Sequence, residues 1–211
     1  MAGAGDPALI PAAGGTSAYP VGVLFLVRHG QTAANAAGLL LGRADPPLTE
    51  LGRQQATALA AALPVPSRVV ASSLGRARET AAAFGQPVEV DDRWVEMDYG
   101  ELDGRPVGSV DDAYWARWRA DPAFAPPGGE SLAMVGGRVR SACSELAASA
   151  QASDVVVVSH VSPIKVAIAW ALGVSDAVAW RMFVADAAVA RIQTGPPAPT
   201  LMSFNEVFPR G

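Results

Sequence analysis

Cysteine, long hydrophobic runs and clusters of metal-binding side chains are scarce in this sequence. Its one cysteine, Cys143, excludes an internal disulfide and a cysteine-rich metal site. No apolar run approaches the roughly 18 residues that a membrane-spanning helix requires, and no dense group of Asp and His residues offers a cage for a cation. We therefore expect no metal, no other cofactor and no membrane as a partner.

A large excess of charge of either sign is absent as well. The 16 Lys and Arg residues and the 20 Asp and Glu residues give a net charge of -4. Basic residues form no block or stripe, so the sequence lacks the electrostatic footprint of nucleic-acid binding. The N-terminus has no basic segment and carries Asp6, which makes it a poor secretory signal. We expect a cytoplasmic protein that does not bind nucleic acid.

The domain organisation follows from length and composition. Residues 1–20 are rich in Ala, Gly and Pro without periodicity, which predicts a flexible leader. The rest of the chain, 21–211, has neither an internal repeat nor a linker, and half of all residues are apolar. This length and composition suit a single domain with a full core. The sequence leaves open whether that domain forms a homodimer.

The only two histidines of the chain occupy similar places. His29 follows the apolar run 21–27, and His160 follows the run 154–159. Such runs are typical of buried parallel strands, whose carboxyl ends form the ligand-binding edge of an open α/β sheet. We therefore predict an α/β fold with both histidines in one site. Arg28, beside His29, offers the planar fork that suits phosphate, although an Arg-His pair alone is a weak motif.

Periodicity and capping residues predict the other elements. Thr49 is expected to cap a helix that ends before Pro64, and Ser72 or Ser73 to cap a helix with Arg76 in its first turns. The expected helices are 48–63, 72–84, 111–119, 131–150 and one that opens near Pro163; the expected strands are 21–27, 68–71, 88–90, 154–159, an antiparallel pair 180–184 and 188–193, and an edge strand 201–204.

Five segments, in this order, resemble the motifs of the histidine phosphatase (phosphoglycerate mutase-like) superfamily. One such motif is weak evidence, but five in the expected order are specific, and together they cover residues 21 to 193. The resemblance implies a three-layer α/β/α sandwich around a mostly parallel sheet. The five segments are Leu26–Thr32, Leu48–Ala56, Ser72–Ala81, Glu96–Gly104 and Val157–His160.

The segment after the second histidine departs from many members of that family. Val161 stands where glycine is common, so its backbone N–H remains available to phosphate while its branched side chain narrows the pocket. The string Ser159–Lys165 is similar to the acid-phosphatase domains that actinobacterial proteins fuse to a ribonuclease H domain. No such partner domain is expected within this chain.

The resemblance implies a catalytic role for five residues. His29 would attack phosphorus and form a phosphohistidine. Arg28, Arg76 and His160 would surround the phosphoryl oxygens, and such preorganised donors often supply the largest share of catalysis. Glu96 would protonate the leaving oxygen and later deprotonate the attacking water.

Other candidate site residues have structural alternatives. Asn35 would donate a side-chain N–H to the phosphate or cap a helix. Arg43 and Tyr99 would contact substrate or have only a structural role in the loops around them. Glu96 could be one more solvated acid. Its competitors are the acids of the same loop, Asp98, Glu101 and Asp103.

Three functions are compatible with these motifs. The leading prediction is a phosphomonoesterase that acts on a small phosphorylated metabolite. A cofactor-dependent phosphoglycerate mutase is the second and a non-catalytic phosphate-binding relative the third. Mutases carry a lysine shortly after the acid loop and an adjacent arginine pair, whereas here Arg105 is the one basic residue of 104–108, and Arg117 and Arg119 are separated. Hydrolysis is therefore favoured over isomerisation.

Overall fold

The computed structural model describes residues 22–209. The predicted flexible leader, 1–20, lies outside the described residues, so the division of the chain into a leader and one domain stays a prediction. Within the described part, no helix is long and apolar enough to cross a bilayer.

The described strands form a six-stranded sheet in the order β3-β2-β4-β1-β5-β6. The first four are parallel, while β5 runs antiparallel to β1 and β6 antiparallel to β5. The predicted, mostly parallel sheet is therefore confirmed. The strands are β1 (Val23–Arg28), β2 (Arg68–Ala71), β3 (Val88–Val90), β4 (Val155–Ser159), β5 (Val189–Gln193) and β6 (Thr200–Glu206).

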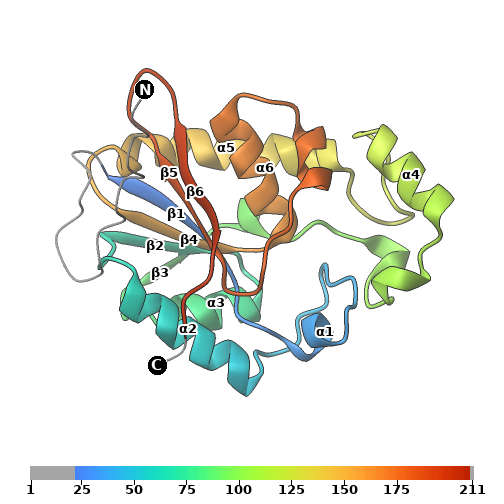
Figure 1. Ribbon diagram of the computed structural model, residues 1–211, viewed down its shortest axis with the longest axis horizontal. Coiled ribbons are helices and arrows are strands. Elements are labelled where there is room, and N and C mark those ends of the chain that lie inside the picture. The colour runs from blue at the N-terminus through green and yellow to red at the C-terminus, as the bar shows by residue number, and fades with distance from the viewer. Residues whose placement is uncertain (1–21, 210–211) are drawn as a thin grey trace, which may run out of the picture.

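Helices cover both faces of this sheet. Figure 1 shows α2 and α3 on one side and α5 and α6 on the other, which is the expected three-layer α/β/α sandwich, with α1 and α4 beyond the strand ends. The α-helices are α1 (Ala33–Ala36), α2 (Glu50–Ala62), α3 (Gly75–Ala82), α4 (Asp112–Ala120), α5 (Leu132–Ala150) and α6 (Val161–Leu172). Short 3₁₀ helices are η1 (Asp92–Trp94), η2 (Gly100–Leu102), η3 (Val107–Ser109) and η4 (Asp176–Arg181).

Burial on both faces explains why the central strands read as unbroken apolar runs. Leu24 and Leu26 of β1 join the core cluster that includes α5 and α6. The alternate residues, Val23, Phe25 and Val27, join the cluster under α2 and α3. Because successive side chains of a strand point to opposite faces, a strand buried on both faces needs an apolar residue at every position.

The predicted strand 180–184 is wrong. The chain forms η4 up to Arg181 and then an irregular segment up to β5, which pairs with β1 instead of a preceding hairpin strand. The apolar side chains that suggested a strand are nevertheless used for packing, because Met182 and Val184 contact the α5–α6 core cluster. Burial without ladder pairing produces the same apolar pattern as a short strand.

The expected cap of α3 is also wrong, whereas that of α2 is confirmed. The side chain of Thr49 accepts the Gly52 N–H at 3.1 Å, as predicted. Helix α3 begins at Gly75 with Leu74 as its N-cap and without a side-chain capping bond. Ser72 accepts the Leu74 N–H at 3.3 Å, but its hydroxyl also lies at the second histidine. The serine after β2 is therefore part of the site described next.

Candidate active site

The two histidines meet at the carboxyl edge of the sheet. Strands β1 and β4 are neighbours, with Arg28 in register with Ser159. The next residue of each strand is a histidine, so the rings of His29 and His160 lie side by side, with centroids 5.0 Å apart. Both rings are buried. The predicted common site of the two histidines is thus present in the geometry.

Hydrogen bonds fix the tautomer of His29. Its Nδ1 lies 2.7 Å from the Gly30 carbonyl oxygen, which can only accept, so the ring proton is assigned to Nδ1. Its Nε2 accepts the Nε–H of Arg76 at 3.2 Å. Both contacts leave Nε2 without a proton, and this atom therefore carries the lone pair that a nucleophile needs.

Burial keeps both imidazoles neutral. It lowers the pKa of His29 well below its usual value, and the positive charges of Arg28 and Arg76 lower that pKa further. For His160, burial is again the main cause of a lowered pKa, followed by His29 and Arg76. A neutral ring at pH 7 is the nucleophilic form, and it avoids adding a cation beside two guanidinium groups.

These shifts predict acid sensitivity of folding. A histidine with a folded pKa below its unfolded value of about 6.5 takes up its proton preferentially on unfolding, so stability is present above that pH and falls below it. The free energy of unfolding should drop by up to about 1.4 kcal/mol per pH unit for each histidine. Urea titrations between pH 7.5 and 5 measure this slope. His29→Gln and His160→Gln should each flatten it, while the exposed Arg78→Gln should not.

Arg76 is held by the loop after α1. Its side chain is fully buried, and its Nη groups donate to the carbonyl oxygens of Gly42 at 2.9 Å and Ala44 at 2.7 Å. Nη1 also lies 3.3 Å from Oδ1 of Asp45. A buried guanidinium is costly unless its donors are satisfied, and these partners leave Nε directed at His29.

Arg28 and His160 each have one buried nitrogen without a hydrogen-bond partner among the described residues. Nη1 of Arg28 donates to the Val184 carbonyl at 2.7 Å, and Nη2 lies 2.8 Å from Asp186, a close ion pair without hydrogen-bond geometry at the carboxylate. Its Nε is buried and has no protein partner, and the same holds for Nδ1 of His160. Buried polar atoms without partners require an explanation. A bound oxyanion would supply an acceptor for Nε of Arg28 and, in the tautomer with a proton on Nδ1, for His160.

Glu96 lies at the amino end of α6. One carboxylate oxygen accepts the Val161 N–H at 3.0 Å, and the other accepts the N–H groups of Ser162 at 3.1 Å and Met97 at 2.7 Å. The side chain is 3% exposed, so Glu96 is not a solvated acid. The Val161 N–H that we expected to bind phosphate donates here to the candidate acid. Helix N-termini attract anions of either kind, so a phosphate bound at this helix end would compete with Glu96 for these donors.

Two of the three competing acids of the loop have structural partners instead, and the third, Glu101, is exposed. Asp103 accepts the backbone N–H groups of Gly42, Arg43 and Ala44 at 2.7 to 2.9 Å. Asp98 accepts the Gly100 N–H at 2.8 Å. Asp103 thus fixes the loop that holds Arg76, and Asp98 fixes the turn of its own loop. Glu96 is the acid of this loop that is buried beside the site.

The remaining predicted site residues have mixed placements. Asn35 closes a capping box with Thr32, accepting its N–H at 3.1 Å, so its capping role is present, and its side chain also lines a cavity with Arg28. Arg43 is paired with Glu130 at 3.0 Å. The Tyr99 hydroxyl lies 3.4 Å from Ser162 Oγ, and burial is the main cause of the raised pKa of this phenol.

Sequence reasoning missed two supporting residues. The Ser72 hydroxyl lies 2.6 Å from Nε2 of His160; its position directly after β2, at the same sheet edge as both histidines, was the available signal. Arg138 of α5 donates to the carbonyl oxygens of Val95 at 2.7 Å and Glu96 at 3.2 Å. These bonds fix the backbone of the loop that carries Glu96. Nothing in the sequence around Arg138 indicates that role.

Gly30 serves packing rather than the approach of a ligand. A Cβ at Gly30 would lie 2.4 Å from the Gly52 carbonyl oxygen, and one at Gly52 would lie 2.2 Å from the Gln31 carbonyl oxygen. The loop after β1 therefore rests directly on the first turns of α2. Glycine at both positions allows this close approach of the two backbones.

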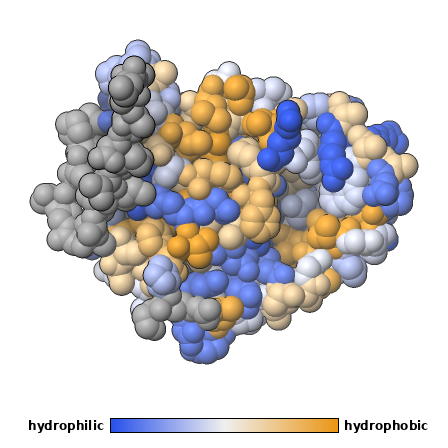
Figure 2. Space-filling view, in the orientation of Figure 1, coloured by the Kyte–Doolittle hydropathy of each residue, from blue (hydrophilic) through white to orange (hydrophobic). Residues whose placement is uncertain are grey.

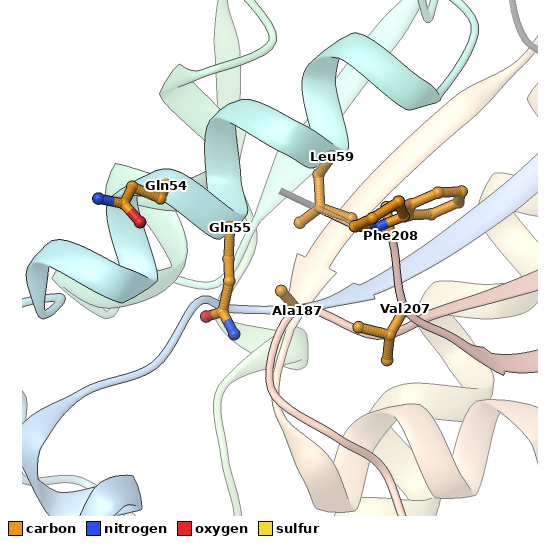
Figure 3. A pocket seen from close by; sticks show the side chains of 7 residues that line it. Gln54, Gln55, Leu59, Ala187, Val207 and Phe208 are labelled. Atoms are coloured by element: carbon orange, nitrogen blue, oxygen red, sulfur yellow. The ribbon is translucent and has the colours of Figure 1, made fainter. Parts of the chain in front are cut away.

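Two cavities adjoin near the site and share Gln55 and Val207. The larger, about 800 Å³, lies against α2 and the C-terminal segment, where Leu59 and Phe208 point toward each other (Figure 3). It contains none of the candidate catalytic residues. The smaller, about 460 Å³, contains Arg28 and Asn35. Despite its smaller volume, this second cavity is the one connected to the chemistry.

Known proteins share this sequence pattern and geometry. A bifunctional protein of Mycobacterium tuberculosis is 38% identical over 159 residues, which span 71% of this chain but 44% of that protein. A glucosyl-3-phosphoglycerate phosphatase of Mycolicibacterium vanbaalenii is 40% identical over 166 residues, covering 71% of this chain and 74% of the relative. The structure of a mycobacterial glucosyl-3-phosphoglycerate phosphatase complexed with VO3 matches with a TM-score of 0.77 and 31% identity, over 87% of this chain and 98% of that chain.

The profile of the histidine phosphatase superfamily (branch 1) matches residues 24–207. That range contains both histidines, Arg76 and Glu96, and all but the first residue of the strands that position them. The expected resemblance is thereby confirmed over nearly the whole described chain. This protein belongs to the histidine phosphatase superfamily.

Proposed function

We propose that the protein is a phosphomonoesterase that hydrolyses a small phosphorylated metabolite through a phosphohistidine on His29. The observation that carries this proposal is the unprotonated Nε2 of His29, which faces the Arg76 guanidinium in a buried site. The buried and unpartnered nitrogens Nε of Arg28 and Nδ1 of His160 add further support. Similar proteins are named as phosphatases, which also supports hydrolysis as the reaction.

The proposed reaction has two steps. Nε2 of His29 forms a bond to phosphorus while the bond to the leaving oxygen breaks, and Glu96 gives that oxygen a proton. Glu96 then takes a proton from water, whose oxygen attacks phosphorus and releases His29. Arg28, Arg76 and His160 stabilise charge on the equatorial oxygens in both steps.

The alternative is a phosphoglycerate mutase, which would return the phosphoryl group to the substrate instead of water. It requires fixed cations for a substrate carboxylate and a second phosphate. Arg43, one cation near the acid loop, is already paired with Glu130, which favours hydrolysis. The test supplies 3-phosphoglycerate with catalytic 2,3-bisphosphoglycerate and follows 2-phosphoglycerate and inorganic phosphate. Rapid interconversion with negligible phosphate release would make the protein an isomerase.

Activity is expected to survive exhaustive chelation. Among residues 22–209, no group of three or more His, Cys, Asp or Glu side chains could hold a metal ion, and the cations near His29 are arginines. Vanadate should inhibit because it adopts the five-coordinate geometry of phosphoryl transfer. The measurement compares phosphate release before and after EDTA treatment. Loss of activity with EDTA and its recovery with magnesium would contradict this prediction.

A further inference from the structure

The cavity beside Arg28 adjoins the candidate phosphate site. Arg28 and Asn35, both candidate phosphate ligands, lie in its lining, and its volume of about 460 Å³ is within the range of small-molecule sites. In phosphate monoester hydrolysis, the group that faces outward from the phosphate is the alcohol. The rest of the lining should therefore match the chemistry of that alcohol.

Apolar side chains make up most of the remaining lining, although several are exposed. Phe183 is 73% exposed, Val207 56% and Val107 44%, and Leu39 completes the rim. On the face of the molecule that Figure 2 shows, hydrophobic residues lie beside a hydrophilic area near the middle. Exposed apolar side chains around a cavity with a polar end are typical of ligand sites.

The charges in this lining offer little to an anionic alcohol. The charged residues among those that line the cavity are Arg28 and Asp186, and they form an ion pair with each other. The free Nε of Arg28 is buried and belongs to the phosphate end. A carboxylate or second phosphate on the leaving group would meet apolar side chains, the neutral Gln55 and one acid, and no cation besides the paired Arg28.

We infer that the natural substrate is the phosphate monoester of a neutral alcohol with an apolar part, which packs against Phe183, Val107 and Leu39. This inference rests on the proposed phosphatase function and names the substrate class of the same site. The apolar part gains binding free energy in proportion to the area that it removes from water. An anionic alcohol would lose its hydration without gaining a partner.

The test compares primary alkyl phosphates, whose leaving alcohols have similar acidity. Ethyl, butyl and hexyl phosphate probe apolar length, and 3-phosphoglycerate probes an anionic alcohol. We expect kcat/KM to rise roughly tenfold or more from ethyl to hexyl phosphate, since each buried methylene contributes severalfold. 3-Phosphoglycerate should be the poorest of the four.

Variants locate the effect in the cavity. Phe183→Ser should reduce the hexyl-to-ethyl ratio severalfold with little change for ethyl phosphate, and its exposed position makes misfolding a poor explanation. Val65→Ser is the matched control, because Val65 is 81% exposed and lies outside the cavity lining. Val107→Lys should shift preference toward 3-phosphoglycerate by adding a cation at the rim.

The outcomes separate this inference from the proposed function. Hydrolysis of every substrate without dependence on chain length, or a preference for 3-phosphoglycerate in the unaltered protein, would overturn the apolar substrate class and leave the phosphatase intact. If neither the four substrates nor an activated aryl phosphate released phosphate, the proposed function itself would be overturned. An unchanged hexyl-to-ethyl ratio in Phe183→Ser would overturn the placement of the alcohol.

Discussion

His29→Ala is expected to abolish turnover and to remove the phosphoenzyme at the same time. The nucleophile forms the bond to phosphorus, and removal of a catalytic nucleophile costs up to about 10⁶-fold in kcat. No neighbouring group replaces it, because Nε2 of His160 is engaged by Ser72 at 2.6 Å. Rapid acid quench with ³²P-labelled substrate, followed by measurement of protein-bound label, tests both losses in one experiment.

His160→Ala is the matched comparison. Its ring is buried beside His29. In the proposed reaction it stabilises charge and does not form the bond, so the expected loss is about 10²–10³-fold in rate. Some phosphoenzyme should therefore still form. Circular dichroism of both variants shows whether the sheet is retained. Label on the His29→Ala protein would assign the nucleophile to another residue.

The central sheet could be predicted because its sequence pattern has a single structural cause. The strands that carry the histidines are buried on both faces, so they appear as continuous apolar runs that end abruptly in polar residues. Parallel pairing then places His29 and His160 at one edge. Scarcity also helped, because two histidines in 211 residues left one possible pair.

Other parts of the site depend on contacts that a sequence does not display. Arg76 is held by the carbonyl oxygens of Gly42 and Ala44, and every residue type has such an oxygen. The segment 180–184 has the apolar pattern of a strand, but the Val184 carbonyl accepts a hydrogen bond from Arg28 instead of pairing in the sheet. The Val184 carbonyl binds a side chain that lies more than 150 residues away in the sequence. Such a contact leaves no local pattern in the sequence.

The contact between Glu96 and α6 is of the same kind, and it affects how the acid works. Phosphate bound at the amino end of α6 would take the N–H groups of Val161 and Ser162 that now hold the carboxylate. We expect the displaced Glu96 to turn toward the leaving oxygen. Binding of the phosphoryl group would thus release Glu96 from α6 and allow it to act as the general acid.

Glu96→Gln is expected to slow alkyl phosphates about 10²–10⁴-fold in kcat/KM. An activated aryl phosphate, whose leaving group needs no proton, should lose far less. The ratio kcat/KM is the correct measure, because it reports steps up to the first departure of the alcohol and excludes the later attack of water. Comparison of hexyl phosphate with 4-nitrophenyl phosphate therefore isolates the acid step.

The Glu96→Gln side chain also changes the contact with α6, and this effect must be separated from catalysis. An amide NH₂ would face the backbone N–H groups that the carboxylate accepts, which costs about 1–3 kcal/mol if one donor is left unpaired. Urea unfolding measures that cost, and the exposed Glu101→Gln in the same loop is the control for both readouts. A loss of stability alone would lower both substrates equally, so equal losses on hexyl and 4-nitrophenyl phosphate would remove Glu96 from the acid role. Unequal losses, with the alkyl ester affected at least tenfold more, would establish it.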